Sequence, residues 1–201
     1  MKIGPKYKIA RRLGAGIFEK TQGQKFALSV ERRGQTRRGR APSEFGKQLL
    51  EKQKMRLSYG LTEKQFSNYV QEAMETKGAN PAETLHQLLE LRLDNVIYRL
   101  GLAKTRRAAR QMVSHGHITI NGVKTTVPSR RVHIGERIAV RGGSKASAMY
   151  TGFAERFMET TSPSWISWNP KDMEGSVTLM PTAESASPAG DIAMVLSFYS
   201  R

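Results

Sequence analysis

The sequence predicts an α+β fold with a basic extended N-terminal arm, a small helical domain, and a helix–helix–hairpin module followed by a short mixed C-terminal segment. Three observations support this prediction. Residues 1–46 are basic and rich in glycine, and they show no sustained apolar period. Residues 62–113 carry apolar side chains three and four residues apart, which is typical of helices packed on a core. Asn121-Gly122 separates two short segments rich in β-branched residues, which indicates a β-hairpin.

The positive charge of the chain is concentrated in two stretches. Its 201 residues carry a formal net charge of +16. Residues 1–57 hold 16 Lys and Arg against 4 Asp and Glu, and residues 104–145 hold 10 against 1. Such blocks indicate a polyanionic partner. A membrane surface could also attract them, but no segment has the amphipathic length or the lipidation signal of an anchor, so nucleic acid is favoured.

The composition also excludes several classes of protein. With no cysteine, the chain cannot form a disulfide, a thiolate zinc site or an iron–sulfur cluster. No apolar run approaches the roughly 18 residues of a membrane-spanning helix, and no secretory signal is recognisable, so a cytoplasmic protein is expected. Phosphate-loop, zinc-protease and nucleophile-elbow motifs are missing. We therefore expect no enzyme, no cofactor and no metal.

Residues 1–46 are expected to form an arm without a core of its own. Their apolar side chains are too few and too irregularly spaced to offset the entropy of ordering the chain. Mutual repulsion of the basic residues also opposes compaction. The arm should therefore become ordered only against a partner.

Three helices are predicted between residues 43 and 92, each from its own start signal. The signals are Ser43, the capping box Thr62 to Gln65, and Asn80 before Pro81. Glycines at 60 and 78 end the first two. The expected core residues are Phe66, Tyr69, Val70 and Ala73 in the second helix, and Leu85, Leu88 and Leu89 in the third.

The helix after Thr105 has two faces of different chemistry. Thr105 is a candidate N-cap, and Gly116 supplies the left-handed residue that ends the helix. At about 100° per residue, one face is suited to a core and the other to an anion. The first face holds Ala108, Ala109, Met112 and Val113, and the second holds Arg106, Arg107, Arg110, Gln111 and Ser114.

In the hairpin that follows, Ile120 should face Val123 and Ile118 should face Thr125 across a type I′ turn. A further strand is predicted around Ile138 and Val140, and a short helix within residues 149–159. Residues 176–180 and 192–199 look like short strands. The expected domains are the arm at 1–46, the module at 93–145, and a helical domain with C-terminal strands at 47–92 and 146–201.

The segments RLDNVIYRLG and TRRAARQMVSHGHITING, at residues 92–101 and 105–122, resemble the RNA-binding module named after small-subunit ribosomal protein four. Similar modules occur in pseudouridine synthases, tyrosyl-tRNA synthetases and a heat-shock ribosome-binding protein. Further matches to the ribosomal protein are GPKYKIARRLG near the start, KMRLSYG at 54–60 and FYSR at the end. Because these matches run from Gly4 to Arg201 in order, the chain is identified as a member of the uS4 family.

Two alternatives are less compatible with the whole chain. A synthase or synthetase that carries the module as an appendage needs a separate catalytic domain, and no remaining segment resembles one. A free RNA-binding chaperone or ribosome-rescue factor is usually shorter and lacks the flanking matches. Many uS4 proteins hold a cysteine zinc knuckle or a Pro-Gly-Gln-His-Gly loop in the arm, whereas this chain has RRGQTRRGR at residues 32–40, so it is a zinc-free variant.

The resemblance implies a structural constituent of the small ribosomal subunit that binds 16S rRNA directly and early. It further implies nucleation of subunit assembly, a contribution to translational accuracy, contact with ribosomal protein five, and a place along the path by which messenger RNA enters. Arg37, Arg38 and Arg40 fall where the family faces that path. The residues expected to bind RNA are Lys6, Lys8, Arg11, Arg12, Arg37, Arg38, Arg40, Lys54, Arg56, Arg106, Arg107, Arg110, Gln111, His115, His117, Lys124, Arg130 and Arg131.

Overall fold

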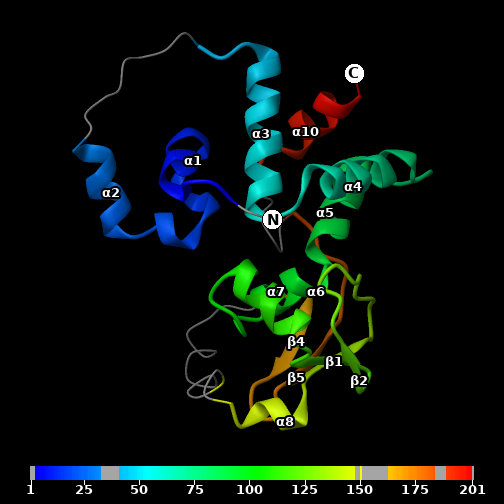
Figure 1. Ribbon diagram of the computed structural model, residues 1–201. Coiled ribbons are helices and arrows are strands. Elements are labelled where there is room, and N and C mark those ends of the chain that lie inside the picture. The colour runs from blue at the N-terminus through cyan, green and yellow to red at the C-terminus, as the bar shows by residue number, and fades with distance from the viewer. Residues whose placement is uncertain (1–2, 33–40, 148–149, 151–162, 184–188, 201) are drawn as a thin grey trace. The chain divides into compact units, whose positions relative to one another are not determined.

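The computed structural model describes residues 3–32, 41–147, 150, 163–183 and 189–200 of an α+β protein (Figure 1). The chain divides into two compact units. Unit 1 comprises residues 1–85 and 188–201, and unit 2 comprises residues 86–187. Among the described residues no helix combines the length and apolar character needed to cross a bilayer.

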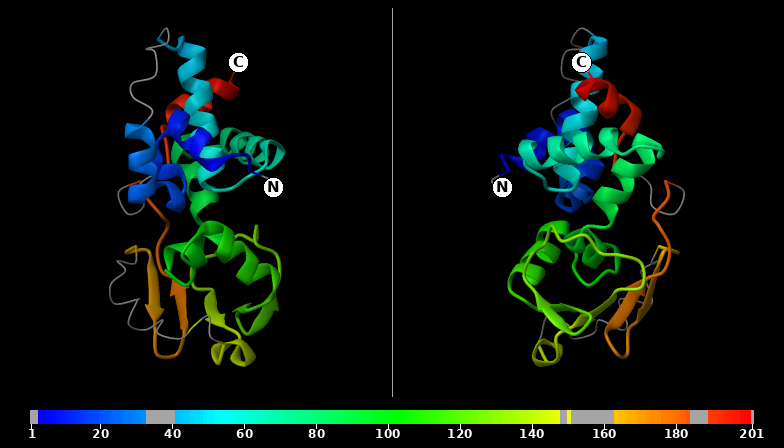
Figure 2. Two further views of the ribbon diagram at one scale, coloured as in Figure 1. Left: turned by 60° about the vertical axis from the view of Figure 1, so that its left-hand side comes forward. Right: turned by 90° about the vertical axis from the view of Figure 1, so that its right-hand side faces the viewer.

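Unit 1 is built from helices. They are α1 (Lys6–Leu13), the 3-10 turns η1 (Ala15–Ile17) and η2 (Glu19–Thr21), α2 (Gln24–Glu31), α3 (Glu44–Ser58), α4 (Glu63–Glu75), the first half of α5 (Pro81–Glu90), and α10 (Ile192–Tyr199). Helices α3 and α10 lie side by side although they are far apart in the sequence (Figures 1 and 2).

The expectation of an extended arm without a core is wrong for residues 6–31. Their short helices bury a cluster of five apolar residues, which packs with Leu50 and Leu57 of α3. The ring of Tyr7 meets that of Phe26 edge-on, with centroids 5.3 Å apart. Each helix is too short to show an apolar period, so only the folded arrangement reveals the core. The buried residues are Ala10, Leu13, Ile17, Phe18 and Phe26.

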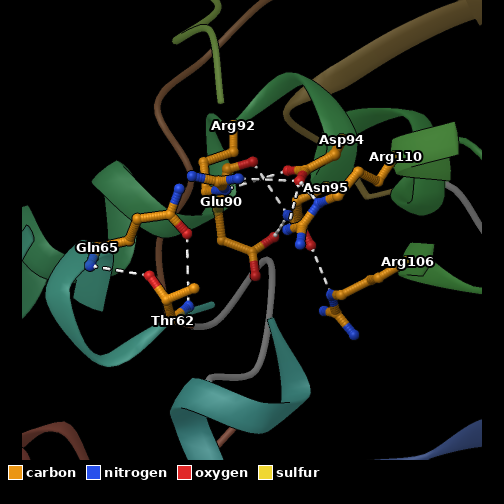
Figure 3. Close-up of polar contacts among 8 residues, drawn as sticks. All are labelled: Thr62, Gln65, Glu90, Arg92, Asp94, Asn95, Arg106 and Arg110. Atoms are coloured by element: carbon orange, nitrogen blue, oxygen red, sulfur yellow. Dashed lines mark hydrogen bonds and ion pairs between the residues drawn. The ribbon is translucent and has the colours of Figure 1, made fainter. Parts of the chain in front are cut away.

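The predicted helix starts are confirmed. The Ser43 hydroxyl accepts from the Gly46 amide at 3.3 Å, and Asn80 Oδ1 accepts from the Ala82 amide at 3.0 Å. Thr62 and Gln65 form the reciprocal capping box, drawn in Figure 3. Of the predicted core residues in α4 and α5, Tyr69 is half-buried, and Phe66, Val70, Ala73, Leu85, Leu88 and Leu89 are buried.

Residues 192–199 form helix α10 and not the predicted strand. Asp191 caps the helix by accepting from the Met194 amide at 3.1 Å. An apolar run of eight residues suits a buried strand as well as a packed helix, and the cap was the signal that separates them. The rings of Phe198 and Tyr199 lie 5.5 and 6.2 Å from those of Phe45 and Phe66.

Unit 2 is a five-stranded antiparallel sheet with helices packed on it (Figure 2). The strands lie in the order β2-β1-β3-β5-β4. The remaining elements are α6 (Leu93–Arg99), α7 (Arg106–Ser114), β1 (Ile118–Ile120), β2 (Val123–Thr125), β3 (Arg137–Val140), α8 (Gly142–Lys145), β4 (Ile166–Asn169) and β5 (Glu174–Val177).

The hairpin has the predicted register, with Ile118 opposite Thr125 and Ile120 opposite Val123. Its turn residues Asn121 and Gly122 have φ angles of 50° and 80°, as a type I′ turn requires.

The sequence assigns the C-terminal strands to the helical domain, but in the structure they belong to unit 2. Strand β5 pairs with β3, and β4 pairs with β5, so both extend the sheet of the hairpin. The module therefore continues past Lys145. A side chain at Gly175 would collide with Ser167 and Trp168 of β4, so glycine is needed where these strands meet. The helix predicted within residues 149–159 lies outside the described residues, apart from Tyr150.

Buried His86 in α5 predicts a dependence of stability on pH. Burial lowers the pKa of His86 below its ordinary value of 6.5, although the charge of Glu90 acts in the opposite direction. Near that pH the unfolded chain takes up a proton on this imidazole and the folded chain does not. We therefore expect the free energy of unfolding to fall as the pH drops below about 6.5.

Thermal unfolding at about pH 7.5 and about pH 5.5 measures this effect. The Tm of the wild type should be lower at the acidic pH, and His86→Leu should reduce that difference because leucine does not titrate. The same substitution at His133, which is exposed, serves as the control and should leave the difference unchanged. An undiminished difference in His86→Leu would contradict the prediction.

Candidate nucleic-acid interface

A buried carboxylate at the start of α6 holds two arginines. Asp94 accepts from Arg92 through Nε at 3.1 Å and through Nη2 at 2.9 Å. It also accepts from Arg110 of α7 through Nε at 2.8 Å and Nη2 at 2.7 Å. The side chains of Arg92 and Asp94 are only 3% and 4% exposed, whereas that of Arg110 is 30% exposed. Figure 3 shows Asp94 between the two guanidinium groups.

A second buried carboxylate holds Arg106 through an intermediate amide. Glu90 is fully buried and accepts from Arg99 through two 2.8 Å hydrogen bonds. Asn95 donates to Glu90 Oε2 at 2.9 Å and accepts from Arg106 Nε at 2.8 Å. The guanidinium of Arg106 also lies 4.4 Å from the centre of the Tyr98 ring. These contacts fix the orientation of α7 on α6 (Figure 3).

The polar face of α7, which the sequence predicts to suit an anion, also makes contacts within the protein. Arg106 and Arg110 compensate buried acceptors, so both contribute to the fold as well as to the local charge. Arg107 and Gln111 are exposed on the same face. Within the described part of the chain, Arg107 makes no hydrogen bond or ion pair. Along this face, Arg106 and Arg110 are hydrogen-bonded to α6, whereas Arg107 between them is exposed.

The predicted apolar face of α7 and its two ends are confirmed. Ala109, Met112 and Val113 are buried, and Ala108 is half-buried. The Thr105 hydroxyl accepts from the Ala108 amide at 3.0 Å. Gly116 ends the helix with a φ of 73°.

Further basic and aromatic side chains lie close to the C-terminal end of α7. A side chain at Gly116 would collide with that of Lys124, so this lysine lies over the end of the helix. The rings of His115 and His117 are 6.0 Å apart, and His117 Nδ1 lies 2.9 Å from Ser144 Oγ. Lys124 and His115 are exposed and add to the polar surface continuous with α7.

Arg130 and Arg131 lie in the segment between β2 and β3. Arg130 donates to Glu136 Oε1 at 2.7 Å and to Thr125 Oγ1 at 3.4 Å. Arg131 is exposed, and its backbone forms an isolated bridge with that of Arg92. Arg130 is thus connected to β2, which also carries Lys124, and Arg131 to the residue that precedes α6.

The predicted RNA-binding residues of unit 1 are more varied in environment. Lys8, Arg11 and Arg12 of α1 are exposed, whereas Lys6 lies 5.4 Å from the centre of the Phe18 ring. Arg37, Arg38 and Arg40 lie outside the described residues. Helix α1 thus presents a row of cations on an ordered element.

Lys54 and Arg56 of α3 are paired within the protein. Lys54 lies 3.4 Å from Glu51, and Arg56 lies 3.2 Å from Glu63. Burial favours the neutral form of Glu63, but hydrogen bonds from Lys52 and Tyr199 and the nearby positive charges outweigh it, so the pKa of Glu63 is lowered. Lys54 and Arg56 therefore offer less uncompensated charge to an external anion than the sequence predicted.

The described residues contain no cluster of three or more His, Cys, Asp or Glu side chains that could hold a metal ion. What each unit offers instead is its own set of guanidinium and ammonium groups on folded elements. Such an arrangement suits the phosphates of a folded nucleic acid, which are recognised by position more than by base sequence.

Comparison with known proteins identifies the family. Residues 1–90 match the Ribosomal protein S4/S9 N-terminal domain family, and residues 91–138 match the S4 domain family. A small ribosomal subunit protein uS4 from Roseiflexus castenholzii is 45% identical over 203 residues, which cover 99% of this chain and 98% of that protein. The chain belongs to the uS4 family. Proteins of the same name from Burkholderia cenocepacia and Akkermansia muciniphila are 42% and 39% identical, over 99% and 98% of this chain and 98% of each relative.

The segments that match the two domain families meet between residues 90 and 91, inside the hydrogen-bond network. Glu90 lies in the first segment, and Asp94 and Asn95 lie in the second. Sequence reasoning missed the role of these three residues, although a signal was present. They stand among closely spaced leucines, a valine and an isoleucine, and buried polar groups require partners. Arg106, one residue after Thr105, is the partner of Asn95, and Arg110, five residues after Thr105, is a partner of Asp94.

Proposed function

We propose that this chain is a structural constituent of the small ribosomal subunit that binds 16S rRNA directly. The observation that carries the proposal is the row of cations on α7, held on a rigid sheet in a chain that matches uS4 proteins along nearly its whole length. It acts by binding and not by catalysis. The exposed cations contact phosphates, and the internal carboxylates hold the guanidinium groups at fixed spacing.

The same proposal extends to assembly and to partners. A protein that binds rRNA through two ordered basic surfaces, on α1 and α7, can bring distant RNA segments together early and nucleate the subunit body. The finer roles that the family resemblance implies are contact with ribosomal protein five, contact with messenger RNA near its path into the subunit, and a contribution to translational accuracy. The place of action is then the cytoplasmic ribosome.

Binding to a folded 16S rRNA fragment should depend steeply on salt. If six or more phosphates are neutralised, affinity falls on the order of 10³-fold between about 50 and 200 mM salt by analogy with duplex DNA. Filter binding or fluorescence anisotropy across that range measures the slope. A nearly flat titration would refute direct phosphate binding.

Arg107→Ala tests whether a cation on α7 matters more for rRNA binding than a positive charge elsewhere on the protein. Because Arg107 is exposed, its loss should weaken rRNA binding about tenfold and leave the Tm nearly unchanged. Lys64→Ala on α4 removes the same charge from another exposed position and is the matched control. If the two variants bind rRNA equally, α7 has no special part in the interface.

A further inference from the structure

Asn95 is buried, at 1% exposure, and is hydrogen-bonded at both ends of its amide. Its nitrogen donates to the backbone oxygen of Glu90 at 3.0 Å and to Glu90 Oε2 at 2.9 Å. Its oxygen accepts from Arg106 Nε at 2.8 Å. These partners determine which end of the amide is which, because a reversed amide would turn its oxygen toward two acceptors.

The anchor of Asn95 is itself rigid. Glu90 is fully buried, and Arg99 occupies both of its carboxylate oxygens at 2.8 Å. A bidentate pair of this kind fixes the carboxylate plane. The amide nitrogen of Asn95 is thereby bound both to the backbone oxygen and to the side chain of Glu90.

Arg106 is restrained at two points by this arrangement. Asn95 Oδ1 accepts from its Nε, and its guanidinium carbon lies over the Tyr98 ring, 4.4 Å from the ring centre. Together the two contacts fix the plane and the direction of the group. Figure 3 shows the terminal nitrogens of Arg106 pointing away from Asn95.

Arg107, the next residue, provides the internal comparison. It carries the same charge but is exposed, with no polar contact in the described part of the chain. Its guanidinium must lose rotamer freedom when it binds an anion, whereas Arg106 has already lost most of it. The two arginines thus offer equal charge with unequal preorganisation.

We propose that Asn95 is a positioning residue for RNA binding, which holds Arg106 in the orientation that receives a phosphate. Asn95 itself is buried and acts only through Arg106. The inference rests on the proposed function and adds to it the residue on which the orientation of one phosphate contact depends. Affinity for folded rRNA should therefore respond to a change that alters no charge.

Charge-preserving substitutions give the first test in the full-length chain. In Arg106→Lys the ammonium has neither the Nε donor for Asn95 nor a flat face for Tyr98, and we expect about tenfold weaker binding to a folded 16S rRNA fragment. Arg107→Lys keeps an exposed point charge and should lose less than about threefold. Equal losses in the two variants would overturn the proposal.

A double-mutant cycle gives the second test. Asn95→Ala should weaken rRNA binding about tenfold in the wild type and in Arg107→Ala, but cause no further loss in Arg106→Ala. It should also reduce the slope of log affinity against log salt by roughly 0.7–0.9, although the net charge is unchanged. A loss of folded protein alone would lower the affinity and leave this slope unaltered.

The outcomes separate this inference from the proposed function. If the wild type shows no salt-dependent rRNA binding, the proposed function itself fails. If the wild type binds and Asn95→Ala keeps the slope, or adds its loss to that of Arg106→Ala, only the positioning role is refuted. Circular dichroism checks folding, and if Asn95→Ala does not fold, the comparison of Arg106→Lys with Arg107→Lys decides alone.

Discussion

Asp94→Ala is expected to lower the free energy of unfolding of unit 2 by about 3–5 kcal/mol, because it leaves a buried arginine without its counter-charge. Arg92 is 3% exposed and makes two hydrogen bonds to this carboxylate. Arg110 loses its contact with Asp94 in the same variant. For a unit of about 100 residues, each 1 kcal/mol corresponds to roughly 4–8 °C in Tm, so thermal unfolding resolves the effect easily.

Glu174→Ala is the matched control for the loss of a carboxylate from an ion pair. Glu174 pairs with Arg137, whose side chain is 66% exposed, and solvent can replace the lost contact there. The control should unfold at nearly the wild-type temperature. If Asp94→Ala behaves like the control, the Asp94 cluster is not a structural centre of the unit.

The elements that the sequence predicted best are those specified by neighbouring residues. The turn at Asn121-Gly122, the capping box from Thr62 to Gln65 and the N-cap at Thr105 depend on interactions within a few residues. The apolar stripes of α4 and α7 are long enough to show a helical period. Local chemistry therefore accounted for α3, α4, α5 and α7 and for the hairpin.

The errors arose where structure depends on contacts that are distant in the sequence. Helix α10 packs on α3 and α4, which lie far earlier in the sequence. The Asp191 amide donates to Glu51 of α3, 140 positions away, and the Tyr199 hydroxyl donates to Glu63 of α4, 136 positions away. The pairing of β5 with β3 joins Arg137 to Ser176 and has no local signal. An apolar run by itself did not specify helix or strand, and no motif indicated which sheet the last strands would join.

The candidate site shows the same division. The sequence placed Arg106, Arg107 and Arg110 on one face of α7, and this grouping stands. It could not reveal that Asn95 and Asp94, on the preceding helix, hold two of the three. Helical periodicity assigns residues to a face, whereas the partners of that face depend on how α6 packs against α7.

Phe26→Ala tests whether the N-terminal segment is folded before RNA binds. Phe26 is 5% exposed and lies in the apolar cluster with the Tyr7 ring packed on it. Truncation of a buried phenylalanine costs about 3–5 kcal/mol, which is enough to open a small cluster of this kind. Without RNA, we expect trypsin to cleave the variant readily at Lys8, Arg11 and Arg12 and the wild type slowly.

Leu28→Ala in the same helix is the control, since Leu28 is 49% exposed and its truncation should leave the cleavage rate unchanged. Rapid cleavage of the wild type at α1 in the absence of RNA would contradict a preformed segment and restore the picture of an arm that orders on its partner. If the segment is preformed, α1 presents its cations without an ordering cost at the moment of binding. Phe26→Ala should then also weaken rRNA binding while it changes no charge, because the freed segment has to be ordered again on the RNA.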